Sequence, residues 1–270
     1  MTSIILSPHF DDAVLSLGGL VAAEADRVIV ATLFAGTPPN PVRGVWDLCC
    51  GFRNSDQAMQ LRTQENENSL LACGIPSTDI RNYAYLDYQY RRAGAMPAGS
   101  PQNLEQMMQC DIGALLEECS GAPVKLFAPG LELHPDHALV KQAALALRNA
   151  GSGNDVDYFL YQDLPYSFAV LRGGKRSLET LEAEISQGTP PLQREVVALS
   201  PEHLYTKLEA VKHHASQMRA LEIGTKLKTA KLSLLGKDLL QILRQYAAMQ
   251  AQSVGLLEGY CEIVYRVGSS

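Results

Sequence analysis

Long apolar runs are absent from this sequence of 270 residues. No stretch approaches the ~18 to 20 consecutive apolar residues that a bilayer-spanning helix requires, so the sequence predicts a protein that does not cross a membrane. A secretory signal is also missing: the chain opens with Met1, Thr2 and Ser3, without basic residues, and Pro8 ends its first short apolar run. We therefore expect a cytoplasmic protein.

Cysteine and basic residues are also sparse. The six cysteines form no CxxC pair and show no regular spacing, which gives no indication of a disulfide framework or a cysteine-rich zinc knuckle and favours reduced thiols. With 23 Lys and Arg against 29 Asp and Glu, the net charge of −6 argues against nucleic acid or an anionic membrane as the main partner. This charge leaves a small molecule as the expected partner. Apolar residues make up 46% of the chain, which predicts a folded globular protein. The sequence leaves the oligomeric state open, a homo-oligomer included.

Strand-like and helix-like patterns alternate along the chain. Short runs of β-branched and other apolar residues predict strands at 4–6, 27–34, 80–86, 124–128, 157–161, 195–199 and 260–267. Apolar residues at helical spacing predict helices at 13–25, 55–73, 103–119, 138–148, 201–221 and 235–250. This alternation predicts a doubly wound α/β fold with a mostly parallel sheet and helices on both faces.

Two irregular segments bear on the domain organisation. Residues 35–51 contain three prolines and three glycines, which predict a substantial loop. We expect its large apolar side chains, such as Trp46 and Leu48, to pin the loop to the surface rather than to cover a substrate. Residues 150–153 are the best linker candidate, but a short polar turn between a helix and a strand is ordinary in α/β proteins. We therefore expect one domain over residues 1–270.

Two polar clusters each follow the carboxyl end of a predicted strand, where open α/β sheets bind their ligands. The segment 8–12 (Pro-His-Phe-Asp-Asp) offers one imidazole and two carboxylates, and the segment 134–137 (His-Pro-Asp-His) offers two imidazoles and one carboxylate. Capping of the helix that follows would explain either cluster alone. Together they can bring three imidazoles and three carboxylates to one edge of the sheet, which capping does not require. They therefore predict a metal site.

The types of ligand favour a catalytic zinc ion, because two imidazoles, one carboxylate and a fourth position open to water recur in such sites. Iron(II), manganese or cobalt would accept the same ligands. A bound metal can lower the pKa of a water to about 7 and polarise a carbonyl oxygen. A free carboxylate could then take a proton from the water, and a free imidazole could stabilise the oxyanion or protonate a leaving amine. The predicted chemistry is hydrolysis.

The two clusters are similar in order and spacing to motifs of the PIG-L/LmbE-like metal-dependent de-N-acetylases. The likeness rests on segment 7–12 (Ser-Pro-His-Phe-Asp-Asp), on the glycine pair at 18–19 and on segment 134–137. Many members have proline in place of Phe10 and an acidic residue in place of Ala13. The second difference removes a carboxylate that could support a metal ligand.

Carried over by position, the resemblance implies a role for each polar residue of the two clusters. The implied zinc ligands are His9, Asp12 and His137. The resemblance also implies that Asp11 is the general base, that His134 is the electrophilic or acid group, and that Asp136 orients His134. Spacing alone does not distinguish the two adjacent aspartates, or the two histidines of the second segment, from each other.

Arg62 and Asp87 are further candidates, for substrate binding. Arg62 and Glu65 resemble the Arg-x-x-Glu helix of the family, whose arginine helps to hold the substrate, but an exposed helical ion pair explains the same pattern. Asp87 follows a predicted strand, at a place where family members hold sugar hydroxyls, and its alternative is an ordinary turn residue. For His213 and His214 we expect a solvated or partly packed helix.

Residues and resemblance together predict a zinc-dependent hydrolase that removes an acetyl group from an N-acetylated amino sugar or a similar small polar amide. Residues 1–165 would form a Rossmann-like metal-binding core, and residues 166–270 would shape the substrate site. One alternative is an amidase that acts on a thiol conjugate or a specialised metabolite. Another is a non-catalytic metal-binding or sugar-binding protein, because a fold alone does not determine an activity.

Overall fold

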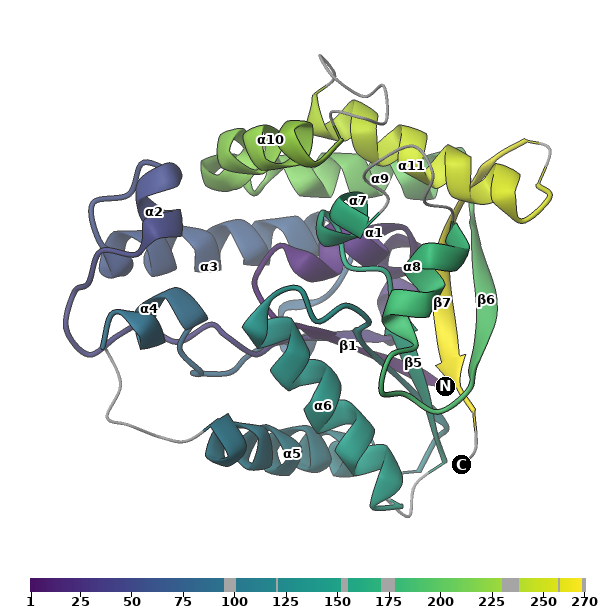
Figure 1. Ribbon diagram of the computed structural model, residues 1–270, viewed down its shortest axis with the longest axis horizontal. Helices are drawn as coiled ribbons and strands as arrows, with labels where there is room; N and C mark the ends of the chain where they lie inside the picture. The colour runs from purple at the N-terminus through teal and green to yellow at the C-terminus, as the bar shows by residue number, and fades with distance from the viewer. Residues whose placement is uncertain are drawn as a thin grey trace.

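A seven-stranded sheet in the order β3-β2-β1-β4-β5-β7-β6 forms the centre of the computed structural model (Figure 1). The structure describes residues 1–94, 101–119, 121–151, 155–170, 178–229, 238–256 and 258–268. The strands are β1 (Thr2–Ser7), β2 (Val28–Thr32), β3 (Ile80–Asn82), β4 (Val124–Pro129), β5 (Val156–Tyr161), β6 (Leu192–Leu199) and β7 (Tyr260–Val267). The first five strands are parallel, and β7 pairs antiparallel with β5 and β6. The predicted α/β fold with a mostly parallel sheet is confirmed.

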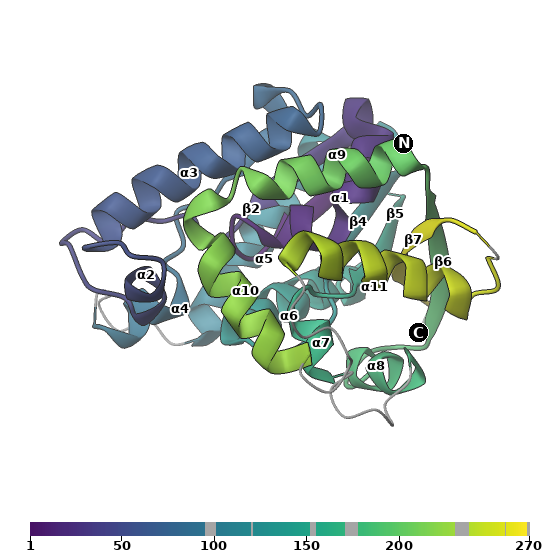
Figure 2. The same cartoon turned by 90° about the horizontal axis from the view of Figure 1, so that it is seen from above.

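Helices cover both faces of the sheet, as predicted (Figures 1 and 2). One face carries α1 (Asp12–Glu24), α3 (Ser55–Ala72), α9 (Pro201–Lys212), α10 (Ala215–Thr229) and α11 (Leu239–Ser253). The other carries α5 (Pro101–Glu118) and α6 (Pro135–Asn149). Shorter helices lie in the connections: η1 (Ala25–Arg27), α2 (Val45–Cys49), η2 (Ser77–Asp79), α4 (Tyr88–Arg92), α7 (Tyr166–Val170) and α8 (Leu178–Ile185). Figure 2 shows α9 between α3 and α11, and α9 packs mainly on α1.

The central strands are apolar on both sides because helices pack on both faces. Ile4, Ile5 and Leu6 of β1 have no exposed surface. In the parallel register, Ile4 lies opposite Ile29 of β2 and Leu126 of β4. These buried rows explain why the strands appear in the sequence as near-continuous apolar runs rather than as alternating patterns.

The strand predicted at 80–86 is shorter than expected. β3 ends at Asn82, and Ala84 instead forms an isolated antiparallel bridge with Phe34. The chain therefore leaves the sheet early. This departure brings Asp87 to the edge of the sheet where the carboxyl ends of the parallel strands lie.

The prediction of a single helix at 201–221 is wrong, because the chain forms two helices, α9 and α10, with a break at 213–214. Ser216, near the start of α10, donates hydrogen bonds to the Glu65 carboxylate from its backbone nitrogen (2.8 Å) and its hydroxyl (2.6 Å). A carboxylate at a helix N-terminus satisfies free N–H groups, so this contact from α3 stabilises the start of the second helix. Two expectations fall partly outside the described residues: the linker at 150–153 and the helix at 235–250.

A buried ion pair from the C-terminal third supports α1. The backbone of α1 departs from helical geometry at Leu17. The Glu262 carboxylate on β7 accepts hydrogen bonds from the backbone nitrogens of Gly19 and the next residue, at 2.9 and 2.8 Å. Lys207 on α9 donates to the same carboxylate at 2.7 Å. A β-carbon at Gly18 would lie only 2.7 Å from Lys207 Cγ, so the glycine pair permits this close packing.

The segments that follow β1, β3, β4 and β5 converge at one edge of the sheet (Figure 1). Doubly wound sheets bind their ligands at this edge, beyond the carboxyl ends of the strands. Within the described ranges, no helix is long and apolar enough to cross a membrane.

Candidate active site

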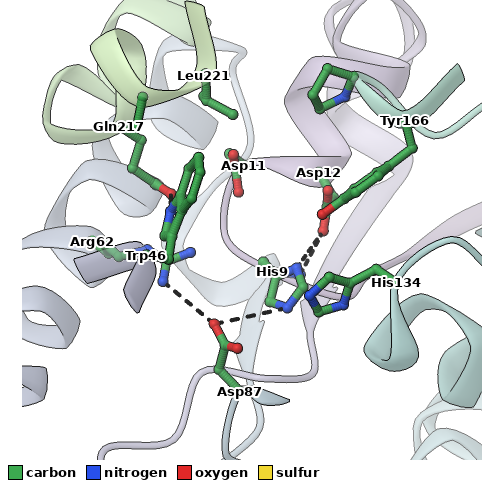
Figure 3. Close-up of a pocket in the computed structure, with 12 residues that line it drawn as sticks. His9, Asp11, Asp12, Trp46, Arg62, Asp87, His134, Tyr166, Gln217 and Leu221 are labelled. Atoms are coloured by element: carbon green, nitrogen blue, oxygen red, sulfur yellow. Dashed lines mark hydrogen bonds and ion pairs between the residues drawn. The ribbon is translucent and has the colours of Figure 1, made fainter. Parts of the chain in front are cut away.

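A cavity opens at this edge of the sheet (Figure 3). Its volume is about 210 Å³, below the roughly 300 to 1,000 Å³ of pockets that enclose a drug-sized ligand. Its polar lining consists of His9, Asp11, Asp12, Arg62, Asp87, His134 and Gln217. Its apolar lining consists of Trp46, Pro165, Tyr166, Ala220 and Leu221. The cavity therefore suits a small group, and the rest of a larger ligand would extend outside it.

Asp12 faces two imidazoles. Its Oδ2 atom lies 3.1 Å from His9 Nδ1 and 3.2 Å from His137 Nε2. The same oxygen accepts a hydrogen bond from the backbone nitrogen of His9 at 2.8 Å. All three side chains are buried. The structure thus brings together the three residues that the resemblance assigns as zinc ligands, and that assignment stays a prediction.

The second ring nitrogen of each imidazole contacts another carboxylate. His9 Nε2 lies 3.0 Å from Asp136 Oδ2, and His137 Nδ1 lies 2.6 Å from Asp163 Oδ1. Imidazoles that bind a metal usually have such a partner on the far nitrogen, which fixes the orientation of the ring. Sequence reasoning missed Asp163. Its signal was a carboxylate placed just beyond the end of the predicted strand at 157–161.

The electrostatics of this centre suit a cation. Burial by itself lowers the pKa of His137, but Asp12 and Asp163 outweigh burial and raise this pKa to about 9. Burial raises the pKa of Asp12, but His137 and His9 outweigh it and hold this pKa well below its usual range. His137 Nε2 is buried and has no hydrogen-bond partner among the described residues. Imidazole nitrogens and a carboxylate oxygen in this arrangement match the donors that zinc and related divalent metals prefer.

Among the described residues, two groups place ligand atoms within 4.8 Å of one another: His9 with His134 and His137, and His9 with Asp87 and Asp136; Asp12 belongs to neither group. In the second group, the Asp136 carboxylate is already engaged, by Arg91 Nη2 at 2.6 Å and by the backbone nitrogen of Tyr88 at 2.9 Å. The first group contains both imidazoles that face Asp12. The geometry therefore favours a cation on the side of His9 and His137.

Asp11 lines the cavity beside Asp12 but lies outside the contacts between Asp12 and the two imidazoles (Figure 3). Its side chain is buried. Burial and the neighbouring charge of Asp12 raise the pKa of Asp11, against the opposing effects of Arg62 and His9. A carboxylate with a raised pKa can accept and hold a proton. This position suits the predicted general base, and the role stays a prediction.

His134 precedes α6 and accepts a hydrogen bond at Nδ1 from the backbone nitrogen of Asp136 (3.2 Å). Acceptance at Nδ1 places the proton of the neutral ring on Nε2. Burial, followed by the charge of His9, lowers the pKa of His134 to about 4, so the ring is neutral near pH 7. The Asp136 carboxylate lies 3.9 Å from His134 Nδ1 but 3.0 Å from His9 Nε2. The carboxylate therefore contacts His9 more closely than the histidine it was predicted to orient.

Arg62 and Asp87 are both buried and line the cavity. Arg62 Nη1 lies 3.8 Å from Asp87 Oδ2, and the guanidinium carbon lies 5.6 Å from the centre of the Phe10 ring. Glu65 is buried too and binds Ser216. The alternative of an exposed helical ion pair between Arg62 and Glu65 is therefore wrong. The proposed contacts of Arg62 and Asp87 with substrate stay predictions.

The C-terminal third contributes cavity residues that sequence reasoning missed. Gln217 is fully buried, and its Oε1 accepts a hydrogen bond from Trp46 Nε1 at 3.1 Å (Figure 3). Leu221, one turn further along α10, lines the same cavity. Trp46 therefore does more than pin its loop to the surface, because it also forms part of the cavity wall. The helical spacing of Gln217 and Leu221 predicts that they share one face of a helix. The neighbouring sequence does not indicate that this face lines a cavity.

His214 differs from the expected solvated or partly packed position. Its side chain is buried, and neither ring nitrogen has a hydrogen-bond partner within the described segments. Burial, followed by the charge of Arg62, lowers the pKa of His214 to about 3. His213 is exposed. His214 therefore packs as a neutral ring at the break between α9 and α10.

The fold and the site define a class of α/β proteins with a histidine- and aspartate-rich centre at the carboxyl edge of the sheet. The PIG-L family model, described as GlcNAc-PI de-N-acetylase, matches residues 4–148, more than half of the chain. The chain belongs to this family, and the resemblance drawn from the two clusters is confirmed. No curated protein sequence matches the chain.

Solved structures match over the whole length. A deacetylase–bog complex from the teicoplanin biosynthesis pathway has a TM-score of 0.72 and 26% identity, covering 100% of this chain and 99% of that chain. The zinc inhibited form of teicoplanin deacetylase Orf2 has a TM-score of 0.73, 25% identity and the same coverage. GalB, the 4-carboxy-2-hydroxymuconate hydratase from Pseudomonas putida, has a TM-score of 0.58 and 15% identity, covering 100% of this chain and 98% of that chain. The likeness to GalB shows the fold alone.

Proposed function

We propose that the protein is a zinc-dependent N-deacetylase that hydrolyses the acetamide of an N-acetylated amino sugar or a related small metabolite. One observation carries the proposal: Asp12 faces two imidazoles, while the adjacent Asp11 lies outside those contacts and lines the cavity. A metal-binding protein needs only the first arrangement, but hydrolysis also needs a base beside it. Family membership and the likeness to teicoplanin deacetylases support an acetamide as the substrate.

His9, Asp12 and His137 would hold the cation. A divalent metal at such a site supplies a water of lowered pKa and polarises a carbonyl oxygen. His137 Nε2 is buried and 3.2 Å from Asp12 Oδ2 without a hydrogen bond to any described residue, which supports a cation there. Zinc suits these donors, and the zinc inhibited form of a similar deacetylase supports the binding of a divalent metal without identifying the active ion. Iron(II), manganese and cobalt suit the same donors, so metal analysis must identify the ion.

The remaining residues supply the proton transfers. Asp11 would accept a proton from water as the new C–O bond forms. His134 would donate a hydrogen bond from Nε2 to the amide oxygen as negative charge develops there. Breaking the C–N bond requires a proton on the departing nitrogen, and Asp11 can return the one it accepted. The products are acetate and a free amine, and no other reactant is needed.

Arg62 and Asp87 would hold the sugar. They place a charged donor and a charged acceptor at the wall of the cavity, a combination that suits hydroxyl groups. The small volume suits the acetamide and its sugar ring better than a polymer. The unpaired state of all six cysteines supports a cytoplasmic setting. We propose that the chain acts as a single domain in which residues 166–270 shape the substrate site.

Metal analysis combined with a mass-spectrometric screen tests the proposal. The purified protein is expected to contain a divalent metal in stoichiometric amount and to remove acetyl from at least one N-acetylated sugar of a panel. The panel includes N-acetylated thiol conjugates, so that an amidase is also detected. A protein that holds the metal but removes acetyl from no compound would contradict the deacetylase. Such a result would favour a binding protein or another reaction on the same fold, such as the hydration that GalB carries out.

A further inference from the structure

Asp163 lies just beyond the end of β5, and its side chain has no exposed surface. Its Oδ1 atom lies 2.6 Å from His137 Nδ1. Its Oδ2 atom accepts hydrogen bonds from the backbone nitrogens of Gly130 at 2.8 Å and Leu131 at 2.7 Å. One buried carboxylate therefore has three partners, and the two at Oδ2 are backbone donors, of which Gly130 also donates to the carbonyl oxygen of Tyr161 at 3.0 Å.

This arrangement determines which nitrogen of His137 carries a proton. An ionised carboxylate only accepts hydrogen bonds, so His137 must donate from Nδ1. In the neutral ring, Nε2 then carries the lone pair that a metal requires. Nε2 is buried, makes no hydrogen bond to a described residue and lies 3.2 Å from Asp12 Oδ2. Asp163 therefore fixes both the tautomer and the direction of the ring.

The same carboxylate fixes the backbone that leads to His137. Gly130 and Leu131 follow β4, and the chain continues from them into α6, whose first turn carries His137. A β-carbon at Gly130 would lie 2.7 Å from the carbonyl oxygen of Tyr161, so glycine allows the ends of β4 and β5 to approach closely. Asp163, just beyond β5, thus holds both the loop that follows β4 and the imidazole of His137.

We infer that Asp163 is a positioning residue for His137 and that it sets the affinity of the site for a divalent cation. It is not among the cavity residues that the structure describes, so it acts through His137 rather than on substrate. The inference rests on the proposed function, because it requires His137 to be a metal ligand. Carboxylates that support a metal-bound imidazole typically contribute about 10- to 100-fold in metal affinity.

Zn²⁺ titration of the full-length protein tests this role. Metal-free wild type and Asp163→Asn are titrated with Zn²⁺ in competition with a chromogenic chelator. Asparagine keeps the size of the side chain but replaces one acceptor with a donor, so it cannot accept hydrogen bonds from both His137 Nδ1 and the backbone nitrogens. The Zn²⁺ dissociation constant is expected to rise about 10- to 100-fold. The visible absorption of the Co²⁺-loaded variant is expected to differ from that of wild type, because the imidazole is no longer held in place.

Asp157→Asn is the matched control. Asp157 lies on β5, the strand that precedes Asp163, but is partly exposed and pairs with Arg266. Its replacement is expected to leave both the Zn²⁺ dissociation constant and the Co²⁺ spectrum unchanged. An effect on affinity that appears in both variants would contradict a specific role for Asp163.

A dissociation constant for Asp163→Asn within about threefold of wild type would overturn the inference. That holds even if the variant is less stable, because loss of stability without loss of affinity defines a purely structural carboxylate. If Asp163→Asn does not fold, Asp163→Ser is the second variant. Its hydroxyl can still accept a backbone hydrogen bond but is too short to reach His137, and the same loss of affinity is expected. Acetate release is measured separately: a wild type that binds Zn²⁺ but releases no acetate contradicts the deacetylase and leaves the comparison of affinities valid.

Discussion

The first 165 residues and the C-terminal third contribute to the site in different ways. The first part supplies every proposed ligand and the proposed base, from segments at the carboxyl ends of parallel strands. The C-terminal third supplies a wall of the cavity, through Gln217 and Leu221, and a support for α1, through Lys207 and Glu262. The proposed ligands and base thus come from short segments at the strand ends and from the first turns of the helices that follow, while residues far away in the sequence complete the wall and support α1.

The family match follows the same division. The PIG-L model covers residues 4–148, which include both polar clusters, and it ends before the helix that carries Gln217. The teicoplanin deacetylase structures cover the whole chain. We therefore expect substitutions in the first part to change metal binding and chemistry, and substitutions in the C-terminal third to change stability and substrate preference.

Asp12→Ala is expected to have the largest effect. It removes the carboxylate between two imidazoles, so the protein should lose its metal and, with it, all deacetylation. Elemental analysis of the purified variant measures the first loss and acetate release the second. Asp26→Ala, at an exposed carboxylate, is the control and should change neither. Full metal content in Asp12→Ala would reject the proposed ligands and favour His9, His134 and His137 as the set.

Asp11→Asn separates the proposed role of Asp11 as general base from that of Asp12 as metal ligand. Loss of a general base typically lowers kcat by about 10²- to 10⁴-fold. The metal content should stay unchanged, because Asp11 lies outside the contacts between Asp12 and the imidazoles. Steady-state kinetics and elemental analysis on the same sample measure both quantities. Full activity at unchanged metal content would show that Asp11 is not the base.

Glu262→Gln tests whether the C-terminal third acts through stability. The substitution leaves Lys207 buried without its charged partner, which typically costs about 3–5 kcal/mol of the free energy of unfolding. Urea unfolding measures this loss, and Glu258→Gln, at an exposed site, should stay within about 0.5 kcal/mol of wild type. The Zn²⁺ affinity of the folded variant should not change. A large loss of affinity would show that the two regions are not separable in this way.

The two polar clusters could be predicted from sequence because their signals are local. Each follows an apolar strand and precedes a helix, and these boundaries place His9, Asp12 and His137 at one edge of the sheet without knowledge of the strand order. The same reasoning predicted the mostly parallel sheet from near-continuous apolar runs. Local pattern and tertiary structure agree at these positions, so the prediction needed no information about distant contacts.

The features that were missed depend on tertiary contacts. Asp163 reaches His137 because β5 lies beside β4, and strand order is not encoded in any single segment. The helix predicted at 201–221 breaks because Glu65 on α3 binds the start of the second helix, while the local sequence is helical throughout. Asp136 contacts His9 more closely than its sequence neighbour His134 for the same reason. In each case a distant partner decides between local alternatives.

The smallest expected effect concerns His214 and acid stability. The pKa of His214 is lowered to about 3 in the folded chain, from an ordinary value of 6.5, because the ring is buried near Arg62. Between these values the unfolded chain binds a proton that the native chain excludes, so stability falls as the pH drops below about 6.5. At about pH 5 this linkage amounts to roughly 2 kcal/mol.

His214→Leu removes this linkage. The free energy of unfolding is measured with urea at about pH 7.5 and about pH 5 for both proteins. Between these pH values, the variant should gain about 2 kcal/mol of stability relative to wild type, whatever the difference between the two proteins near neutral pH. His213→Leu, at the exposed neighbour, should show no such pH-dependent difference. A difference between wild type and His214→Leu that stays constant with pH would mean that His214 is protonated or hydrated in the folded chain. The environment of His214 at the junction of α9 and α10 would then be polar, like the centre formed by the first 165 residues, and not apolar, like the cavity wall.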